Sequence, residues 1–248
     1  MNYTVETILN HRSIRKFKAE KLTKDQIHTI VKAAQQASTS SHVMAYTIIG
    51  ITDENLKAEL SAVSGQPYVK DNGHLFVFCG DLNRVYQQAS REEQLQMQES
   101  MESTEQFIVT TIDAALAAQN ASIAAESMGL GICFIGSLRN DITQVSNLLG
   151  LPERVIPLFG LAVGYPDQQP EIKPRLPLEV IYHVNEYKNE EKQQTLITDF
   201  DDQLTSYYQN RSNNTRKDTW TKQMIRKYSH PIRMDVKPFI KDKKFNNR

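Results

Sequence analysis

The residues of this sequence best suited to do chemistry stand close to its start, in the stretch HRSIRKF at positions 11–17. It places His11, Arg12, Ser13 and Arg15 within five positions, directly after a short apolar turn. Guanidinium, imidazole and hydroxyl groups are the donors that bind phosphate and other anions. The sequence therefore favours an anion site here, with a solvated surface patch as the alternative.

Three other polar stretches lie at the ends of predicted elements. Ser38 to Ser41 is a run of four hydroxyl residues, Gln66 offers an amide in the turn GQPYV, and Lys173 and Arg175 flank a proline. None of these stretches is specific alone. Together they supply cations and hydroxyls for a phosphate and an amide for a heterocycle, and they predict a phosphorylated heterocyclic cofactor held by scattered loops.

The known glycine-rich phosphate loops do not account for these stretches. Gly129, Gly131 and Gly136 miss the GxGxxG spacing and follow a predicted helix instead of opening one, and no GxxxxGK[ST] motif occurs. No Cys/His cluster has metal-ligand spacing, so no metal site is expected.

Composition indicates a folded protein with one sizeable domain. The chain has 248 residues, of which 40% are hydrophobic and 23% charged. We expect a cytoplasmic protein without a membrane partner, because there is no signal-peptide core and no apolar run approaches the ~20 residues that span a bilayer. Cys79 and Cys133 lie in apolar, strand-like runs and are expected to be buried thiols.

The hydrophobic pattern alternates between helical and strand periods. Apolar runs predict strands at 45–51, 74–80, 131–136 and 155–165, and helices are expected near 53–63, 141–150, 193–209 and 219–228. A capping box at Thr23 and Gln26 opens a further helix. Residues 104–128 lack Pro and Gly and are rich in alanine, which predicts one long helix buried in a core or at a two-fold interface.

The net charge of zero conceals an asymmetry. Residues 211–248 contain 12 Lys or Arg against 3 Asp, whereas residues 1–210 contain 17 against 26 acidic residues. A basic segment on an acidic body is either a solvated tail or a binder of phosphate, and an anion- or nucleic-acid-binding protein is one alternative function.

The order of these motifs resembles the flavin-dependent nitroreductase family. HRSIRKF is followed by SSH before the strand YTIIGITD, then by GQPYV, LGICFIGSLRN, PLFGLAVGYP and KPRLP. Within the family, the chain looks most like the oxygen-insensitive NADPH nitroreductases and NADPH-flavin oxidoreductases of group A, whose C-terminal arm YYQNRSNNTRKDTW also matches. The likeness covers nearly the whole chain.

This resemblance implies an α+β fold with a mixed, mostly antiparallel sheet surrounded by helices. It implies an intertwined homodimer, with one tightly bound, non-covalent FMN per active site at the interface. Residues 1–190 would form the FMN-binding core, and residues 191–248 a C-terminal helical arm of the same domain with a basic loop that contacts NADPH.

The resemblance also assigns roles to individual residues. Arg15 becomes the fixed cation near flavin N1 and O2, and no side-chain acid or base is assigned. Ser137 stands where the family has glycine, and Thr39 where the subgroup commonly has serine. The FMN-binding set is His11, Arg12, Ser13, Arg15, Ser38, Thr39, Ser41, Gln66, Phe134, Ile135, Gly136, Ser137, Lys173 and Arg175, and the NADPH-binding set is Arg211, Arg216 and Lys217.

The implied activity is that of an NADPH-dependent, FMN-containing oxidoreductase. It would reduce nitro compounds, quinones, free flavin or disulfide reagents in two-electron, ping-pong steps, with a role in redox and disulfide-stress defence. The alternative within enzymes is a flavin reductase that supplies reduced FMN to a partner. Small-molecule electron acceptors, and no nucleic acid, are the expected partners.

Overall fold

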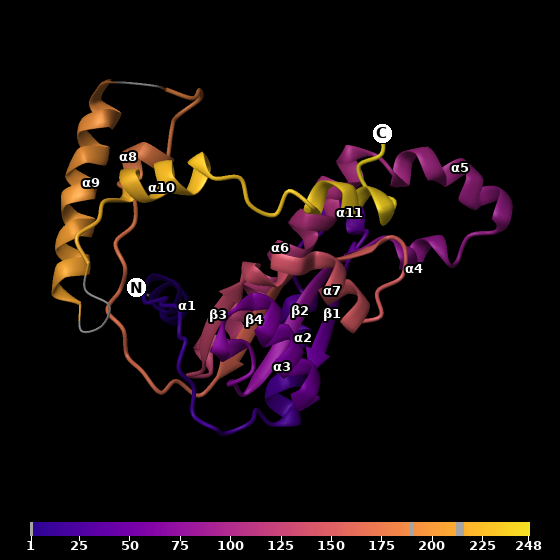
Figure 1. Ribbon diagram of the computed structural model, residues 1–248, viewed down its shortest axis with the longest axis horizontal. Helices are drawn as coiled ribbons and strands as arrows, with labels where there is room; N and C mark the ends of the chain where they lie inside the picture. The colour runs from indigo at the N-terminus through magenta and orange to yellow at the C-terminus, as the bar shows by residue number, and fades with distance from the viewer. Residues whose placement is uncertain (1, 189–190, 212–215) are drawn as a thin grey trace. The chain divides into compact units, whose positions relative to one another are not determined.

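The computed structural model describes residues 2–188, 191–211 and 216–248 (Figure 1). The chain divides into two compact units, which are described separately below. Unit 1 is Met1–Gln169 together with Arg233–Arg248, and unit 2 is Pro170–Ile232. The sequence-based division into a core at 1–190 and an arm at 191–248 stays a prediction.

Unit 1 is built on a four-stranded sheet in the order β1-β2-β4-β3. Its strands are β1 (Tyr46–Ile51), β2 (His74–Asp81), β3 (Gly131–Ile135) and β4 (Val155–Gly164). The α+β class is confirmed, but every pair of these strands is antiparallel, so the sheet is not mixed as expected. β2 and β4 are central because both of their faces are apolar, which lets helices cover the sheet on both sides.

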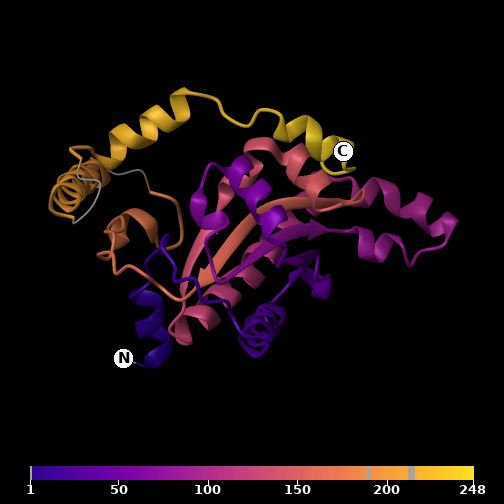
Figure 2. The same cartoon turned by 60° about the horizontal axis from the view of Figure 1, so that its bottom comes forward.

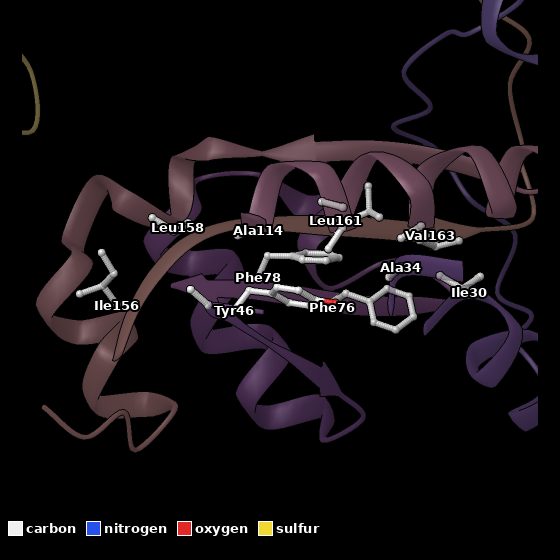
Figure 3. Close-up of a cluster of buried hydrophobic side chains, with 14 of the residues drawn as sticks. Ile30, Ala34, Tyr46, Phe76, Phe78, Ala114, Ile156, Leu158, Leu161 and Val163 are labelled. Carbon is white, nitrogen blue, oxygen red and sulfur yellow. The ribbon is translucent and has the colours of Figure 1, made fainter. Parts of the chain in front are cut away.

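Helices lie on both faces of the sheet (Figure 2), and alternate residues of β2 pack against the two sides. Phe76 and Phe78 pack with helices α2 (Lys24–Gln35) and α6 (Thr104–Ser127), as Figure 3 shows. Leu75, Val77 and Cys79 face the other way, toward α3 (Glu54–Ser64) and α7 (Ile142–Leu148). The period of two along a strand therefore gives two apolar layers, one on each side of the sheet.

The alanine-rich helix α6 crosses one face of the sheet. Ala114, Ala117, Ala118 and Ala125 are fully buried, and their small side chains allow close packing against the strands and α2. Of the described helices, only α6 has the length and apolar composition to span a membrane, and here it packs in the core. One stripe of apolar side chains on α6 is exposed to solvent: Ile108, Ile112 and Leu116 are 45%, 46% and 44% exposed.

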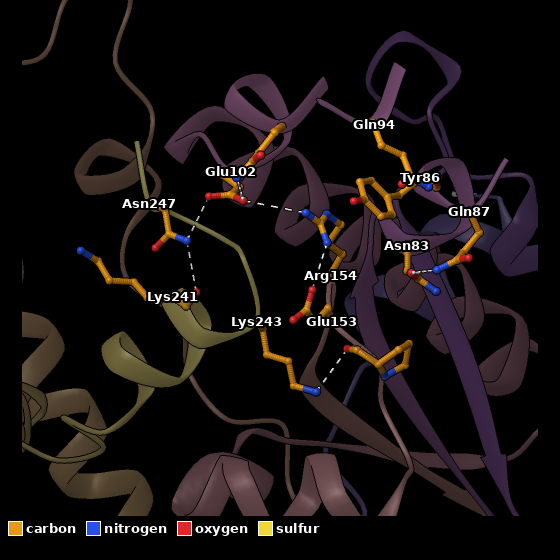
Figure 4. Close-up of polar contacts among 12 residues, drawn as sticks. Asn83, Tyr86, Gln87, Gln94, Glu102, Glu153, Arg154, Lys241, Lys243 and Asn247 are labelled. Atoms are coloured by element: carbon orange, nitrogen blue, oxygen red, sulfur yellow. Dashed lines mark hydrogen bonds and ion pairs between the residues drawn. The ribbon is translucent and has the colours of Figure 1, made fainter. Parts of the chain in front are cut away.

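The basic end of the chain returns to unit 1 and packs there (Figure 4). Phe239 and Ile240 of α11 (Val236–Asp242) and the following Phe245 are buried. The Arg154 amide donates to the carbonyl of Lys243 at 2.9 Å, and the Asn247 amide to that of Glu102 at 2.8 Å. Residues 236–248 are thus part of the fold rather than a solvated tail.

Several helices have no strong apolar period in the sequence and were not predicted there. In unit 1 these are α4 (Asn83–Tyr86), α5 (Arg91–Met101) and α11, and the short apolar segment before HRSIRKF forms the helix α1 (Tyr3–Leu9). Unit 2 contains α8 (Leu178–Ile181), α9 (Glu191–Asn210) and α10 (Trp220–Ser229). Its apolar centre is Phe200, Leu204 and Tyr208 of α9, packed against Leu176 and Trp220.

Candidate functional site

The stretch HRSIRKF lies along strand β3 at the edge of the sheet. Ser13 forms a parallel bridge with Ile132, and the Ile14 amide donates to the Ile132 carbonyl at 2.8 Å. Further along, Phe17 pairs with Pro166. Ile14 is buried, while the neighbouring side chains from His11 to Ser13 are half-buried and Arg15 is exposed. The segment therefore anchors through one apolar residue and leaves its polar side chains accessible.

Two glycines allow this close approach. A Cβ at Gly131 would stand 2.6 Å from the Cγ1 of Ile14. At Gly164 it would stand 2.8 Å from the backbone nitrogen of Gly73 and 2.9 Å from the Cδ1 of Phe17. Both separations are below van der Waals contact, so larger residues would push the polar segment away from the sheet.

His11 and Arg12 are oriented by nearby acceptors. The Nδ1 of His11 is 2.7 Å from the Oε1 of Glu126 on α6, and Nε of Arg12 donates to the Asn10 carbonyl at 3.2 Å. Arg12 also lines a cavity of about 680 Å³ within unit 1. Its other walls are Asn10, Ile14, Gly129, Leu130, Gly131, Pro166, Asp167, Gln168 and Gln169.

Arg15, Tyr68 and Cys133 meet at the same edge of the sheet. Burial raises the pKa of the Tyr68 hydroxyl and of the Cys133 thiol, and the Arg15 guanidinium acts against both rises. Tyr68 belongs to the turn η2 (Pro67–Val69), directly after Gln66. The structure thus brings the first polar stretch and the GQPYV turn together with β3.

The turn that carries Gln66 is fixed by a buried polar pair. Asn72 donates through Nδ2 to the carbonyls of Tyr68 and Val69, both at 2.9 Å, and accepts from the Nζ of Lys57 at 3.2 Å. Lys57 is only 1% exposed, and burial lowers its pKa to about 8. Neither Lys57 nor Asn72 was identified from the sequence, because each looks like an ordinary surface residue there.

The run Ser38 to Ser41 leads into a loop with unusual backbone angles. Ser41, His42 and Met44 have φ values of 47°, 57° and 51°, in the left-handed region that residues other than glycine rarely adopt. Such strain persists only where the surrounding structure holds it, and it is concentrated at functional sites. In this chain the restraint comes from two charged side chains.

Asp113 and Arg84 hold the loop from two sides. Asp113 is fully buried on α6, and its two carboxylate oxygens accept from the amides of Ser40 at 2.9 Å and Ala45 at 3.0 Å. Arg84 donates to the carbonyls of Met44 and Tyr46 at 3.2 and 3.0 Å. Sequence reasoning missed both; the available signal was a single carboxylate within an alanine-rich apolar helix.

The end of β3 presents an aromatic surface. Phe134 is 39% exposed between buried Cys133 and Ile135, and its ring packs edge-on against Phe159 at 5.8 Å. Gly136 and Ser137 follow at the start of η3 (Gly136–Asp141) and are half-buried. A planar heterocycle fits such an apolar surface beside polar backbone.

In unit 2, three of the predicted phosphate-binding cations gather around one ring. Lys173 Nζ and the guanidinium carbons of Arg211 and Arg216 lie 5.6, 4.8 and 4.1 Å from the centroid of Tyr208. Arg175 is exposed and donates to the Lys173 carbonyl at 2.7 Å, and Lys217 is also exposed.

The donor set fits FMN. Unit 1 offers guanidinium, imidazole and hydroxyl groups for a phosphate and ribityl chain, an amide at Gln66, and an exposed aromatic at Phe134 for a flat ring. Lys173 and Arg175 belong to unit 2, and their assignment to the FMN phosphate stays a prediction. Among the described residues, no cluster of three His, Cys, Asp or Glu could hold a metal ion.

Comparison with known proteins gives a match over nearly the whole chain. The model of the nitroreductase family matches residues 8–165, and that of the family's C-terminal domain matches residues 173–248. An FMN reductase (NADPH) of Bacillus subtilis is 50% identical over 248 residues, which cover 99% of each protein.

Solved structures give the same result. A nitroreductase from Bacillus subtilis superposes with a TM-score of 0.94 at 49% identity, covering 99% of this chain and 100% of that one. The NADPH:FMN oxidoreductase of Vibrio harveyi, solved with NAD⁺, gives a TM-score of 0.88 at 37% identity over the full length of both chains.

Proposed function

The chain belongs to the nitroreductase family and is an NADPH-dependent oxidoreductase enzyme, and on that premise we propose that it works through a tightly bound FMN in ping-pong, two-electron steps. The observation that carries the proposal is the meeting of Arg15, Tyr68 of the turn after Gln66, and Cys133 of β3 at one sheet edge. These are the parts of the site that a phosphorylated flavin requires from unit 1.

The bound FMN supplies hydride acceptance from NADPH and delivery of two electrons to an acceptor. Around it, Arg15 provides a fixed positive charge for flavin N1 and O2, because a guanidinium stays protonated at every relevant pH. The Gln66 amide and the backbone of 134–137 orient the ring. The phosphate and ribityl groups are held by His11, Arg12, Ser13, Ser38, Thr39, Ser41, Lys173 and Arg175.

Catalysis in this proposal requires position and charge rather than a side-chain acid or base. Water can protonate the reduced product, so no proton donor is assigned. Two-electron delivery releases no nitro radical to oxygen, so nitro reduction would be insensitive to oxygen. From the resemblance to the family we propose nitro compounds, quinones, free flavin and disulfide reagents as acceptors. Such an enzyme would act in the cytoplasm in redox and disulfide-stress defence.

The proposal includes a homodimer built on α6. The exposed stripe Ile108, Ile112 and Leu116 recurs every four residues, so it forms one continuous apolar face on the helix. A two-fold interface would bury the same stripe on both copies.

A flavin reductase that supplies reduced FMN to a partner is the second candidate. It is favoured by the 50% identity to a protein named FMN reductase (NADPH). The basic C-terminal segment, in contrast, gives little support to a nucleic-acid-binding protein, because residues 236–248 pack onto unit 1.

Cofactor release and turnover test the proposal together. The purified protein should be yellow and release FMN rather than FAD, and it should oxidise NADPH with nitrofurazone as the acceptor. Faster turnover with free FMN than with nitrofurazone would favour the flavin reductase. A colourless protein that does not take up added FMN would overturn the proposal.

A further inference from the structure

Tyr208 occupies an unusual place among the cations of unit 2. It lies on α9 and is only 2% exposed, yet Lys173, Arg211 and Arg216 all have their charged groups within 6 Å of its ring centroid. The two arginines come from either side of the 212–215 segment, whereas Lys173 comes from the start of the unit. One buried ring is therefore the common contact of two nearby arginines and of a lysine that is distant in sequence.

The contacts of Arg216 show how this ring acts as a support. Its amide donates to the Tyr208 carbonyl at 3.2 Å, and its Nη2 donates to the Oε1 of Gln223 at 2.6 Å. The Tyr208 hydroxyl donates to the same Gln223 oxygen at 3.3 Å. The Arg216 guanidinium is thus held by a ring face and a side-chain amide, while its backbone is tied to the Tyr208 carbonyl, so its orientation is defined before any ligand arrives.

Two cations of the cluster form no close ion pair in the described part of the chain: neither Lys173 nor Arg216 has a carboxylate within 4 Å. The nearby Asp218 pairs with Arg226 at 2.6 Å, and this bond, together with the more distant charge of Arg216, lowers the pKa of the Asp218 carboxyl. Burial raises the pKa of the Tyr208 hydroxyl, but Lys173 and Arg216 lower it by more, so the net shift is downward. A positive potential that stabilises a phenolate also attracts a phosphate dianion.

We propose that Tyr208 is a positioning residue that holds Arg211 and Arg216 for the 2′-phosphate of NADPH, and so sets the preference for NADPH over NADH. The inference rests on the proposed function. Long arginine side chains lose rotamer freedom when they bind a phosphate, and a rigid ring that already orders them removes much of that cost. NADH lacks the 2′-phosphate and gains nothing from this order.

Substitution of the ring tests the inference, with its neighbour as the control. Tyr208→Leu removes the ring, whereas Tyr208→Phe keeps the ring and removes only the hydroxyl. The control, Tyr207→Leu, removes an adjacent, half-buried ring over which no cation lies in the described part of the chain. We expect Tyr208→Leu to raise KM for NADPH about tenfold, with kcat and the KM for NADH changed less than about twofold. Tyr208→Phe should raise KM for NADPH by about threefold at most, and Tyr207→Leu should not separate the two nucleotides.

A binding measurement gives a readout that is independent of turnover. Trp220, the sole tryptophan, packs against Phe200 in unit 2, so its fluorescence should report binding of adenosine 2′,5′-bisphosphate to the holoenzyme. Tyr208→Leu should weaken this binding about tenfold. Should that variant not fold, Gln223→Met frees Arg216 and should raise KM for NADPH alone.

Two different failures can be told apart. If the Tyr208 variants affect NADPH and NADH equally, or bind the bisphosphate as the wild type does, the positioning role is wrong while the enzyme's function stands. If the wild type does not oxidise NADPH, the proposed function itself is wrong.

Discussion

Asp113→Asn tests whether one buried carboxylate holds the loop that carries the predicted flavin-binding hydroxyls. The substitution keeps the volume of the side chain and replaces one oxygen by an NH₂ group, which cannot accept from a backbone amide. Asp113 is fully buried and accepts from the amides of Ser40 and Ala45 at 2.9 and 3.0 Å. One of these two amides would lose its partner.

The size of the effect follows from these two bonds. A hydrogen bond to a charged group contributes about 1.5–3 kcal/mol, so the pair contributes about 3–6 kcal/mol. Asparagine retains one neutral bond of about 1 kcal/mol, which leaves a loss of about 2–5 kcal/mol in the free energy of unfolding. Domains of this kind have about 5–15 kcal/mol in total, so the variant should still fold.

The assay combines denaturant unfolding of the apoprotein with titration of FMN by flavin fluorescence. Because Ser41, His42 and Met44 are in left-handed conformations, a released loop should relax, and FMN should bind at least about tenfold more weakly. The matched control is Glu105→Gln, an exposed carboxylate in the first turn of the same helix, which should cost less than about 1 kcal/mol. An Asp113→Asn variant with wild-type stability and FMN affinity would refute the reasoning.

Three further predictions concern assembly, pH and the cofactor. Ile112→Glu places a charge in the middle of the exposed α6 stripe and should yield monomers in sedimentation; an unchanged dimer would show that the interface lies elsewhere. Burial lowers the pKa of His74 from 6.5 to about 4, and the positive charges of Lys57 and Lys21 add to this shift. Between these pH values the unfolded chain binds a proton that the folded chain does not, so the free energy of unfolding should fall by about 3 kcal/mol as pH drops from 6.5 to 4. His74→Leu should abolish this part of the acid unfolding curve, and an unaltered curve would assign it to other groups. Arg175→Ala should weaken FMN binding by roughly 10- to 150-fold through loss of one charge-assisted bond, and an unchanged dissociation constant would remove Arg175 from the site.

The secondary structure was predicted well where local rules act alone. β2 and β4 are long apolar runs because both of their faces are covered, and the α2 capping box between Thr23 and Gln26 is present in both directions. Helix α6 ends before Gly129, whose φ of 75° is left-handed. The helix α5 was missed although Ser90 and Glu93 form a second capping box, because its surface is mostly polar.

The supports of the candidate site could not be predicted, because they depend on contacts between residues far apart in the chain. Asp113 reaches a loop some seventy positions earlier, and Lys173 meets a ring on α9. The hydrophobic period of a segment does not predict which distant residue a side chain will contact, and the type of each of these residues is common in its own segment. The polar stretches themselves were visible because their residue types are unusual for a loop or a helix end.

The most direct test of the central claim is one anaerobic mixing experiment. The flavin is first identified as FMN by releasing it from one sample of the purified protein. A second sample, with its flavin bound, is then mixed with a stoichiometric amount of NADPH without any acceptor, and the flavin absorbance is followed. We predict that the flavin band bleaches on NADPH addition, more slowly with NADH at equal concentration, and returns when nitrofurazone or a quinone is added. A flavin band that persists after the addition of NADPH, or protein that carries no flavin after reconstitution, would contradict the account.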